Sequence, residues 1–259
     1  MKWNGTITEV EIYGTNYVFM RSPKCSYKVN FNRMVKLATM FEELSDKFDG
    51  MINRGSGVTD LARCALACKM MMYTGIRIGN EASAEGYTTN PHPNSKAEPK
   101  FVQTYGLTTM LREHAYPIGR RVKFRFLGKR YMENTFEVGG LLAKQVKELM
   151  KNYHGETLFG VTDYELTKFV KKYVGRHFMP KDFRTLRANM VACEALAEIE
   201  DRELPHTKSE YNAEVKEVAT AVSEELNNTV GVCKRSYIDD LFWEYMASAR
   251  PIVKRGGRR

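Results

Sequence analysis

Four separated segments of this sequence combine basic side chains with groups suited to phosphate chemistry. They are TGIRIGNE (74–81), FRFLGKRYMENTFEV (124–138), MPKDFRTLRA (179–188) and LNNTVGVCKRSYID (226–239). Guanidinium groups stay charged and offer two parallel N–H donors to an oxyanion. A tyrosine phenol is a nucleophile that also leaves readily, because its pKa is only about 10. Each segment alone is ordinary, since such residues usually lie on a surface or cap a helix.

In this order, the segments resemble the active-site motifs of type IB DNA topoisomerases of the poxvirus-like and bacterial branch. Family members have an arginine in a loop reading Arg-Ile/Val-Gly-Asn-Glu, which corresponds to Arg77. The family's Ser-Tyr-Gly-Leu-Thr-Thr-Leu follows as TYGLTTM at 104–110. The family's catalytic lysine comes after Phe-Leu-Gly in a hairpin, which corresponds to Lys129.

The resemblance continues through the second half of the chain and spans about Asn30 to Ile238. Lys-Asp-Phe-Arg-Thr of the family is unchanged at 181–185. The family's nucleophile follows Asn-Thr-Pro-x-Val-Cys and two basic residues, which implies Tyr237 as nucleophile and Asn228 as a phosphate contact. Val230 replaces the usual proline, and Asn228 stands where the poxvirus enzymes carry histidine.

This resemblance implies that the phenol of Tyr237 attacks a phosphodiester, cuts one DNA strand through a 3′-phosphotyrosyl bond and reseals it. Arg77 and Arg184 would bind the non-bridging oxygens, where one cation at about 4 Å is worth on the order of 4 kcal/mol. Lys129 would protonate the leaving 5′ oxygen. Lys181 stands one helical turn before Arg184, which predicts that both share a face; proton relay and electrostatic roles both remain open for it.

The resemblance thus gives two sets of candidate residues. The predicted catalytic residues are Arg77, Lys129, Lys181, Arg184, Asn228 and Tyr237. The predicted DNA-binding residues are Tyr105, Lys123, Arg125, Arg130, Lys234 and Arg235.

Helices and one hairpin must position these residues. Apolar spacing predicts an amphipathic helix over 33–52 and another from Thr59 or Asp60 through Tyr73. Alternation predicts a strand with Val122, Phe124 and Phe126 on one face, joined by a turn at 127–130 to a second strand over 131–138. Prolines predict a loop over 84–100. Later helices are predicted to start near Leu141, Thr162, Pro180, Thr207, Val230 and Ile238.

The predicted fold class is mainly α with a small β-hairpin or sheet, the catalytic-domain fold that tyrosine recombinases and type IB topoisomerases share. Residues 1–30 are expected to form a short β-rich or extended arm, truncated relative to the family's N-terminal clamp domain. The catalytic domain is predicted over 31–250, and a basic tail over 251–259.

Composition favours a polyanionic partner, because 40 Lys and Arg against 31 Asp and Glu give a net charge of +9. We expect a monomer that binds double-stranded DNA. The five cysteines and five histidines show no ligand spacing, so neither a metal nor a cofactor is expected. No apolar run suggests a membrane span or signal peptide, which predicts a cytoplasmic protein, or a host-cell or virion protein if viral.

Two other classes of protein share this pattern. A tyrosine recombinase or integrase-like strand transferase usually carries histidine three residues before its second arginine, where this chain has Lys181. A non-catalytic DNA-binding protein on the same scaffold would usually have lost at least one of the catalytic residues. The complete set therefore favours the topoisomerase.

Overall fold

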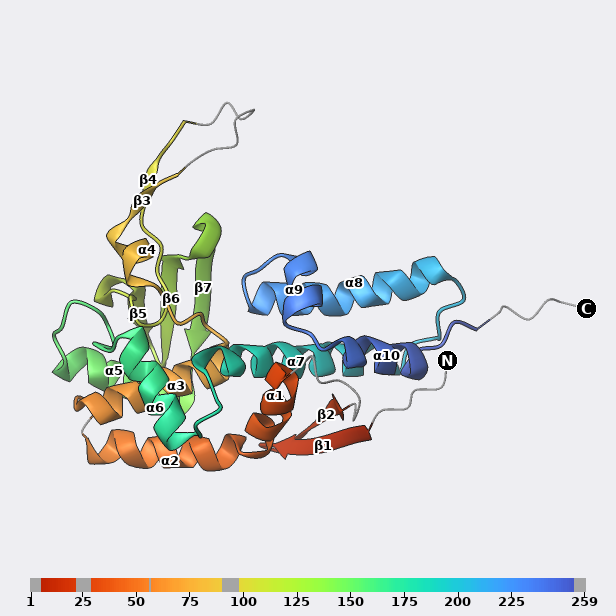
Figure 1. The fold of residues 1–259 in the computed structure, drawn as a ribbon, viewed down its shortest axis with the longest axis horizontal. Helices are drawn as coiled ribbons and strands as arrows, with labels where there is room; N and C mark the ends of the chain where they lie inside the picture. The colour runs from red at the N-terminus through yellow and green to blue at the C-terminus, as the bar shows by residue number, and fades with distance from the viewer. Residues whose placement is uncertain (1–5, 22–28, 56, 90–97, 254–259) are drawn as a thin grey trace, which may run out of the picture. The chain divides into compact units, whose positions relative to one another are not determined.

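The chain is organised as two units, one of which is made from both ends of the sequence. The computed structural model describes residues 6–21, 29–55, 57–89 and 98–253. Residues 1–42 and 182–259 belong to unit 1, and residues 43–181 to unit 2. Helices dominate, with small antiparallel sheets (Figure 1), which confirms the predicted fold class. None of the described helices is both long and apolar enough to span a bilayer.

Unit 2 is built on helices and a three-stranded sheet. Its main helices are α2 (Phe41–Arg54, whose first two residues count with unit 1), α3 (Asp60–Thr74), α5 (Gly140–Asn152) and α6 (Asp163–Tyr173). The sheet has the order β5 (Ala115–Ile118), β6 (Arg121–Leu127), β7 (Glu133–Val138). Val122, Phe124 and Phe126 on β6 are buried, as their alternation predicts.

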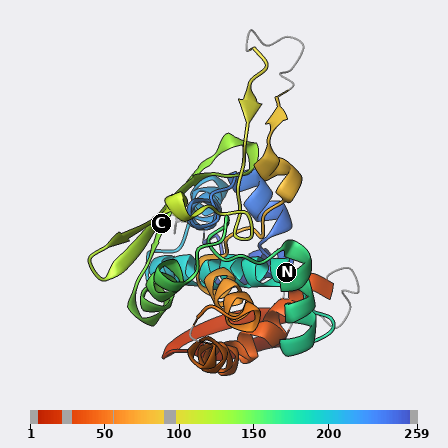
Figure 2. The same ribbon diagram turned by 90° about the vertical axis from the view of Figure 1, so that its left-hand side faces the viewer.

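A short arm extends from unit 2 next to this sheet (Figures 1 and 2). It consists of α4 (Glu81–Glu85), β3 (Tyr87–Thr88) and β4 (Phe101–Val102), with β3 and β4 paired antiparallel. Two short 3-10 turns, η1 (Arg112–His114) and η2 (Lys129–Tyr131), flank the sheet strands.

Unit 1 packs a β-hairpin and helix α1 (Val29–Thr39) together with the C-terminal helices. The hairpin is β1 (Thr6–Ile12) and β2 (Thr15–Arg21). The helices are α7 (Pro180–Glu200, which begins in unit 2), α8 (Lys208–Glu225), α9 (Val230–Ser236) and α10 (Asp240–Ala249). Apolar residues of α7 to α10 form one buried core, against which Val18 of β2 packs.

The hairpin is tied to α7 by specific bonds. The hydroxyl of Tyr17 donates to a carboxylate oxygen of Glu194 at 2.8 Å, and Cys193 donates to the carbonyl of Val18 at 3.1 Å. Burial and the Glu194 carboxylate raise the pKa of the Tyr17 phenol well above its usual value. The N-terminal hairpin is therefore an integral part of unit 1.

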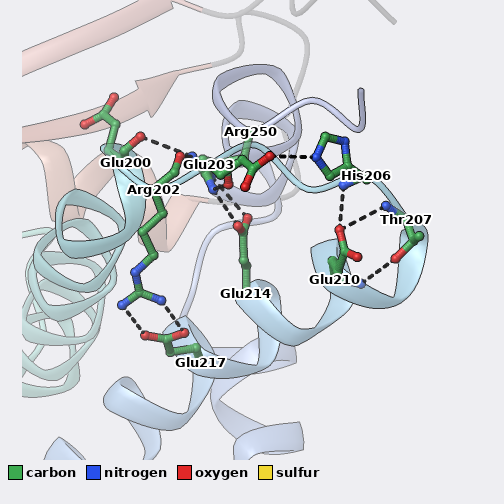
Figure 3. Close-up of polar contacts among 9 residues, drawn as sticks. All are labelled: Glu200, Arg202, Glu203, His206, Thr207, Glu210, Glu214, Glu217 and Arg250. Atoms are coloured by element: carbon green, nitrogen blue, oxygen red, sulfur yellow. Dashed lines mark hydrogen bonds and ion pairs between the residues drawn. The ribbon is translucent and has the colours of Figure 1, made fainter. Parts of the chain in front are cut away.

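A buried arginine fastens the end of α10. Arg250 is 1% exposed and donates two hydrogen bonds to the carboxylate of Glu214, at 2.6 and 3.2 Å (Figure 3). It also donates to the carbonyl oxygens of Glu200, Arg202 and Glu203, at 2.7 to 3.1 Å. Because the charge is paired and its donors are bonded, its burial is tolerated. The C-terminal end of α10 is thereby joined to α8 and to the end of α7.

Three predicted elements differ from the structure. The single helix predicted over 33–52 is two helices, because the amide of Met40 bonds to Leu37 at 3.2 Å while the hydroxyl of Thr39 bonds to the carbonyl of Lys36. The hairpin gains a third strand, β5, that its short and mostly exposed sequence did not reveal. The predicted 84–100 loop includes the end of α4 and all of β3; its residues 90–97 lie outside the described chain.

Candidate active site

Arg77 lies in the loop after α3, and this loop packs directly on the segment 104–109. The amide of Leu107 donates to the carbonyl of Arg77 at 2.8 Å, and both the amide and the hydroxyl of Thr108 donate to the carbonyl of Ile78 at 2.7 Å. A side chain on Gly106 would come within 2.5 Å of the backbone of Gly79. The two glycines therefore allow two backbones to touch beneath Arg77.

Lys129 lies in the turn between β6 and β7 and is exposed. The amide of Gly128 donates to the carbonyl of Met132 at 2.8 Å, which closes the turn. The two residues after Lys129 are Arg130 and Tyr131, and both have positive φ angles, 63° and 61°. Non-glycine residues in this region cost about 1 to 2 kcal/mol each, so the turn carries strain next to a predicted catalytic group.

One segment joins the supports of Arg77 and Lys129. The amide of Tyr105 donates to the carbonyl of Leu127, two residues before Lys129, at 2.8 Å. Two residues later, Leu107 bonds to Arg77. Unit 2 thus fixes the loop of Arg77 and the base of the Lys129 turn through the same short stretch of backbone.

Unit 1 brings Arg184 and Tyr237 into contact. The guanidinium carbon of Arg184 lies 5.1 Å from the centre of the Tyr237 ring. Arg184 is 5% exposed and donates to the carbonyl of Leu226 at 2.6 Å, which holds it against the loop between α8 and α9. Tyr237 ends α9 and is partly buried against the unit 1 core.

Asn228 lies in the same loop as Leu226, one residue before the N-cap of α9. Its side-chain oxygen accepts from the amide of Thr229 at 3.1 Å. Its side-chain nitrogen is buried, and no hydrogen-bond partner for that atom occurs among the described residues. A buried donor without a partner is costly, which makes this nitrogen a suitable donor for a bound anion.

Asn189 is a residue that the sequence motifs did not indicate. It is 2% exposed, and its side-chain nitrogen donates to the carbonyl oxygens of Thr185 and Tyr237, both at 2.8 Å. Its side-chain oxygen accepts from the amide of Asp239 at 3.1 Å. It therefore ties the backbone around Tyr237 to α7, the helix of Arg184. In the sequence, Asn189 is marked only by its position one helical turn after Thr185, the last residue of the motif at 181–185.

Lys181 differs from Arg184 in its surroundings. Both belong to α7, but Lys181 is exposed whereas Arg184 is buried, so the two predicted catalytic residues differ in exposure. Asp182 between them is fully buried and accepts from Arg33 of α1 at 2.9 and 3.2 Å. This bidentate pair anchors the first turn of α7.

The predicted DNA-binding residues fall in both units. In unit 2, Tyr105 packs edge-on against His114 at 4.5 Å between ring centres, and Arg125 pairs with Glu133 at 2.9 Å. Lys123 is partly exposed on β6, and Arg130 is exposed in the Lys129 turn. In unit 1, Lys234 and Arg235 are exposed on α9, and the ammonium of Lys234 lies 5.5 Å from the ring centre of Trp243.

No cluster of metal-ligating side chains occurs in the part of the chain that the structure describes. Asp239 caps α10 by accepting from the amide of Leu241 at 3.1 Å. Burial raises the pKa of the Cys64, Cys68 and Cys193 thiols, as expected for buried cysteines.

The predicted catalytic residues thus fall into two groups. Arg77 and Lys129 share a support in unit 2, whereas Arg184, Asn228 and Tyr237 gather in unit 1 around the loop before α9 and the end of that helix. Lys181 lies at the boundary, in the first turn of α7.

Comparison with known proteins supports the sequence resemblance. The family described as "Eukaryotic DNA topoisomerase I, catalytic core" matches residues 25–241. A DNA topoisomerase 1B of Acanthamoeba polyphaga mimivirus is 23% identical over 150 residues, covering 52% of this chain. The chain spans about half the length of that relative, since the match covers 45% of it. With most of its length inside the family match, the chain belongs to the type IB DNA topoisomerase family.

Proposed function

We propose that this chain relaxes supercoiled DNA by transient cleavage of one strand, with Tyr237 as the nucleophile. The observation that carries the proposal is the contact of the buried Arg184 guanidinium with the Tyr237 ring, at 5.1 Å. A buried arginine beside a tyrosine suits a nucleophile that must approach a phosphate, because the cation binds the anion that the phenol attacks.

The proposed step exchanges one phosphoester bond for another. The phenol oxygen of Tyr237 forms a bond to phosphorus and loses its proton to solvent, while the bond from phosphorus to the 5′ oxygen breaks. The 5′ oxygen takes a proton from the ammonium of Lys129, which solvent then restores. Religation runs the same steps backwards, so the cleaved bond's energy is retained and no ATP is consumed.

The other residues bind the charge that develops on the non-bridging oxygens. Arg77 and Arg184 supply permanent cations, and the side-chain nitrogen of Asn228 supplies a neutral donor. Removal of one such donor typically costs about 10² to 10³ in rate. We propose that neither a metal ion nor a cofactor is needed.

Plasmid relaxation tests the proposal. Negatively supercoiled plasmid is incubated with the protein in EDTA without ATP, and relaxed topoisomers are separated by electrophoresis. Wild-type protein and Tyr164→Phe, which changes a tyrosine that is 70% exposed on α6, should relax the plasmid. Tyr237→Phe should not relax it, because the phenyl ring lacks the attacking oxygen.

A second readout separates the alternatives. Stopping the wild-type reaction with detergent should leave protein covalently attached to a 3′ DNA end, and Tyr237→Phe should give no such adduct. Recombined products without relaxed topoisomers would instead favour a strand transferase. DNA binding with no adduct from the wild-type protein would favour a non-catalytic DNA-binding protein.

A further inference from the structure

The turn that carries Lys129 has a second point of attachment, which lies on the arm. The ring of Tyr131, two residues after Lys129, lies 6.2 Å from the ring of Tyr87 on β3, with an angle of 34° between the ring planes. A side-chain hydrogen bond between Tyr131 and Tyr87 raises the pKa of Tyr131. Both side chains are still partly exposed, at 39% for Tyr87 and 42% for Tyr131, so this contact is not part of the core.

The turn needs such a contact because its backbone is strained. Arg130 and Tyr131 both have positive φ angles, and a bulky aromatic residue rarely adopts this conformation. Strained residues persist where their surroundings hold them. The hydrogen bond from Gly128 to Met132 closes the base of the turn but does not hold Tyr131 itself.

The arm that holds Tyr131 is itself fixed to the loop of Arg77. Asn80, three residues after Arg77, caps α4 by accepting from the amide of Ser83 at 3.0 Å. The amide of Thr104 donates to the carbonyl of Ser83 at 2.8 Å, which brings the returning strand back to α4. A side chain on Gly86 would come within 2.2 Å of the Phe101 ring, so this ring covers Gly86 beside Tyr87.

We propose that Tyr87 and Tyr131 are positioning residues that hold the Lys129 turn in the conformation that presents its ammonium to the leaving 5′ oxygen. The inference rests on the proposed role of Lys129 as general acid. The contact connects the arm that starts at the Arg77 loop with the tip of the β6–β7 turn. It acts in addition to the bond from Tyr105 to Leu127, which supports only the base of that turn.

Single-turnover cleavage with two leaving groups tests this inference. Cleavage sites are first mapped on plasmid DNA with wild-type protein, and a short duplex with one mapped site is then made in two forms. One form carries the natural 5′ oxygen at the cleaved bond, and the other carries sulfur. A thiol with a pKa of about 8.5 leaves without a proton, whereas an alcohol needs one.

Loss of the contact between Tyr87 and Tyr131 should resemble loss of the general acid, Lys129. Lys129→Ala should slow cleavage of the oxygen substrate by about 10² to 10³ and leave the sulfur substrate nearly unaffected. Tyr87→Ala and Tyr131→Ala should each slow the oxygen substrate by about tenfold or more and spare the sulfur substrate, and the double variant should be no slower than either alone. Tyr87→Phe keeps the ring and should lose less.

The matched control is Tyr116→Ala on β5, which removes a tyrosine that is 47% exposed on the same sheet and should cleave both substrates at the wild-type rate. The inference is overturned if the Tyr87 and Tyr131 variants cleave the oxygen substrate as fast as this control, or if they slow both substrates equally. If Lys129→Ala cleaves the sulfur substrate as slowly as the oxygen substrate, the proposed role of Lys129 as general acid fails. This outcome concerns Lys129 alone, so it is distinguishable from failure of the positioning role of Tyr87 and Tyr131.

Discussion

Two side chains, one a cation and the other an amide, contact the proposed nucleophile Tyr237 in different ways. Arg184 contacts the ring itself, whereas Asn189 hydrogen-bonds to backbone atoms, namely the carbonyl oxygens of Thr185 and Tyr237 and the amide of Asp239. In the proposed reaction, Arg184 therefore acts on the phosphate directly, while Asn189 acts through the position of Tyr237.

We predict that Asn189→Ala slows DNA cleavage by about 10- to 100-fold at unchanged DNA affinity, because a small displacement of a reacting group is costly. Asn189→Asp keeps the acceptor for the Asp239 amide but loses the donor to Tyr237, and should be similarly slow. Single-turnover cleavage and filter binding measure the two quantities. Asn152→Ala, exposed at the end of α5, is the control. Weakened binding with normal cleavage of bound DNA would contradict the prediction.

The sequence could indicate only those candidate residues that stand in a characteristic local motif. Arg77, Lys129, Arg184 and Tyr237 stand in short strings of fixed spacing, whereas Asn189 meets Tyr237 across 48 positions and belongs to no string. The contact between Tyr87 and Tyr131 escapes the sequence for the same reason. Pairs that only the folded chain brings together leave no periodic signal in one sequence.

Helix starts were the most predictable elements because their signals are local. A helix starts next to Thr162 as predicted, where Thr162 and Glu165 form a capping box, and the helix predicted from Thr59 or Asp60 has Thr59 as its N-cap. The end of α1 was missed, since the break at Met40 comes from the Thr39 hydroxyl competing for a backbone carbonyl. Strand β5 was missed because it is four residues long and mostly exposed.

The Arg77 loop and segment 104–109 approach each other closely at Gly79 and Gly106. Gly106→Ala should reduce relaxation at least tenfold and destabilise unit 2 by about 1 to 3 kcal/mol, because its new methyl group would meet the backbone of Gly79 at 2.5 Å. Gly139→Ala is the control, since nothing lies within 4 Å of a side chain there. Thermal unfolding and plasmid relaxation measure both effects; a Gly106→Ala protein indistinguishable from this control would disprove the close approach.

At the scale of the whole molecule, the net charge of +9 provides a field that attracts a polyanion without reading its sequence. The exposed basic residues differ in how much of that charge is balanced. Arg125 is paired with Glu133 and Arg202 with Glu217, both at 2.9 Å. Arg130 and Lys234 are exposed near the two groups of predicted catalytic residues.

We predict that Arg130→Ala and Lys234→Ala each reduce the slope of log binding constant against log salt by about one, since each removes about one phosphate contact. Arg202→Ala should leave the slope unchanged, because its charge is already balanced by Glu217. Binding to a plain duplex between low and physiological salt gives the slopes. Wild-type slopes for Arg130→Ala and Lys234→Ala would show that these two residues do not contact the DNA.

Unit 1 is built from two separate stretches of the sequence, which has a consequence for the order in which the chain folds during synthesis. Its hairpin and α1 are synthesised before unit 2, but the helices that they pack against come from residues 182–259, which are synthesised after it. Unit 2 is continuous, and all its residues are synthesised before residues 182–259, so it can fold as a unit before unit 1 is complete. A nascent chain therefore displays the supports of Arg77 and Lys129 before it contains Tyr237. The proposed strand cleavage, which requires Tyr237, is thus acquired only after unit 2 has been synthesised.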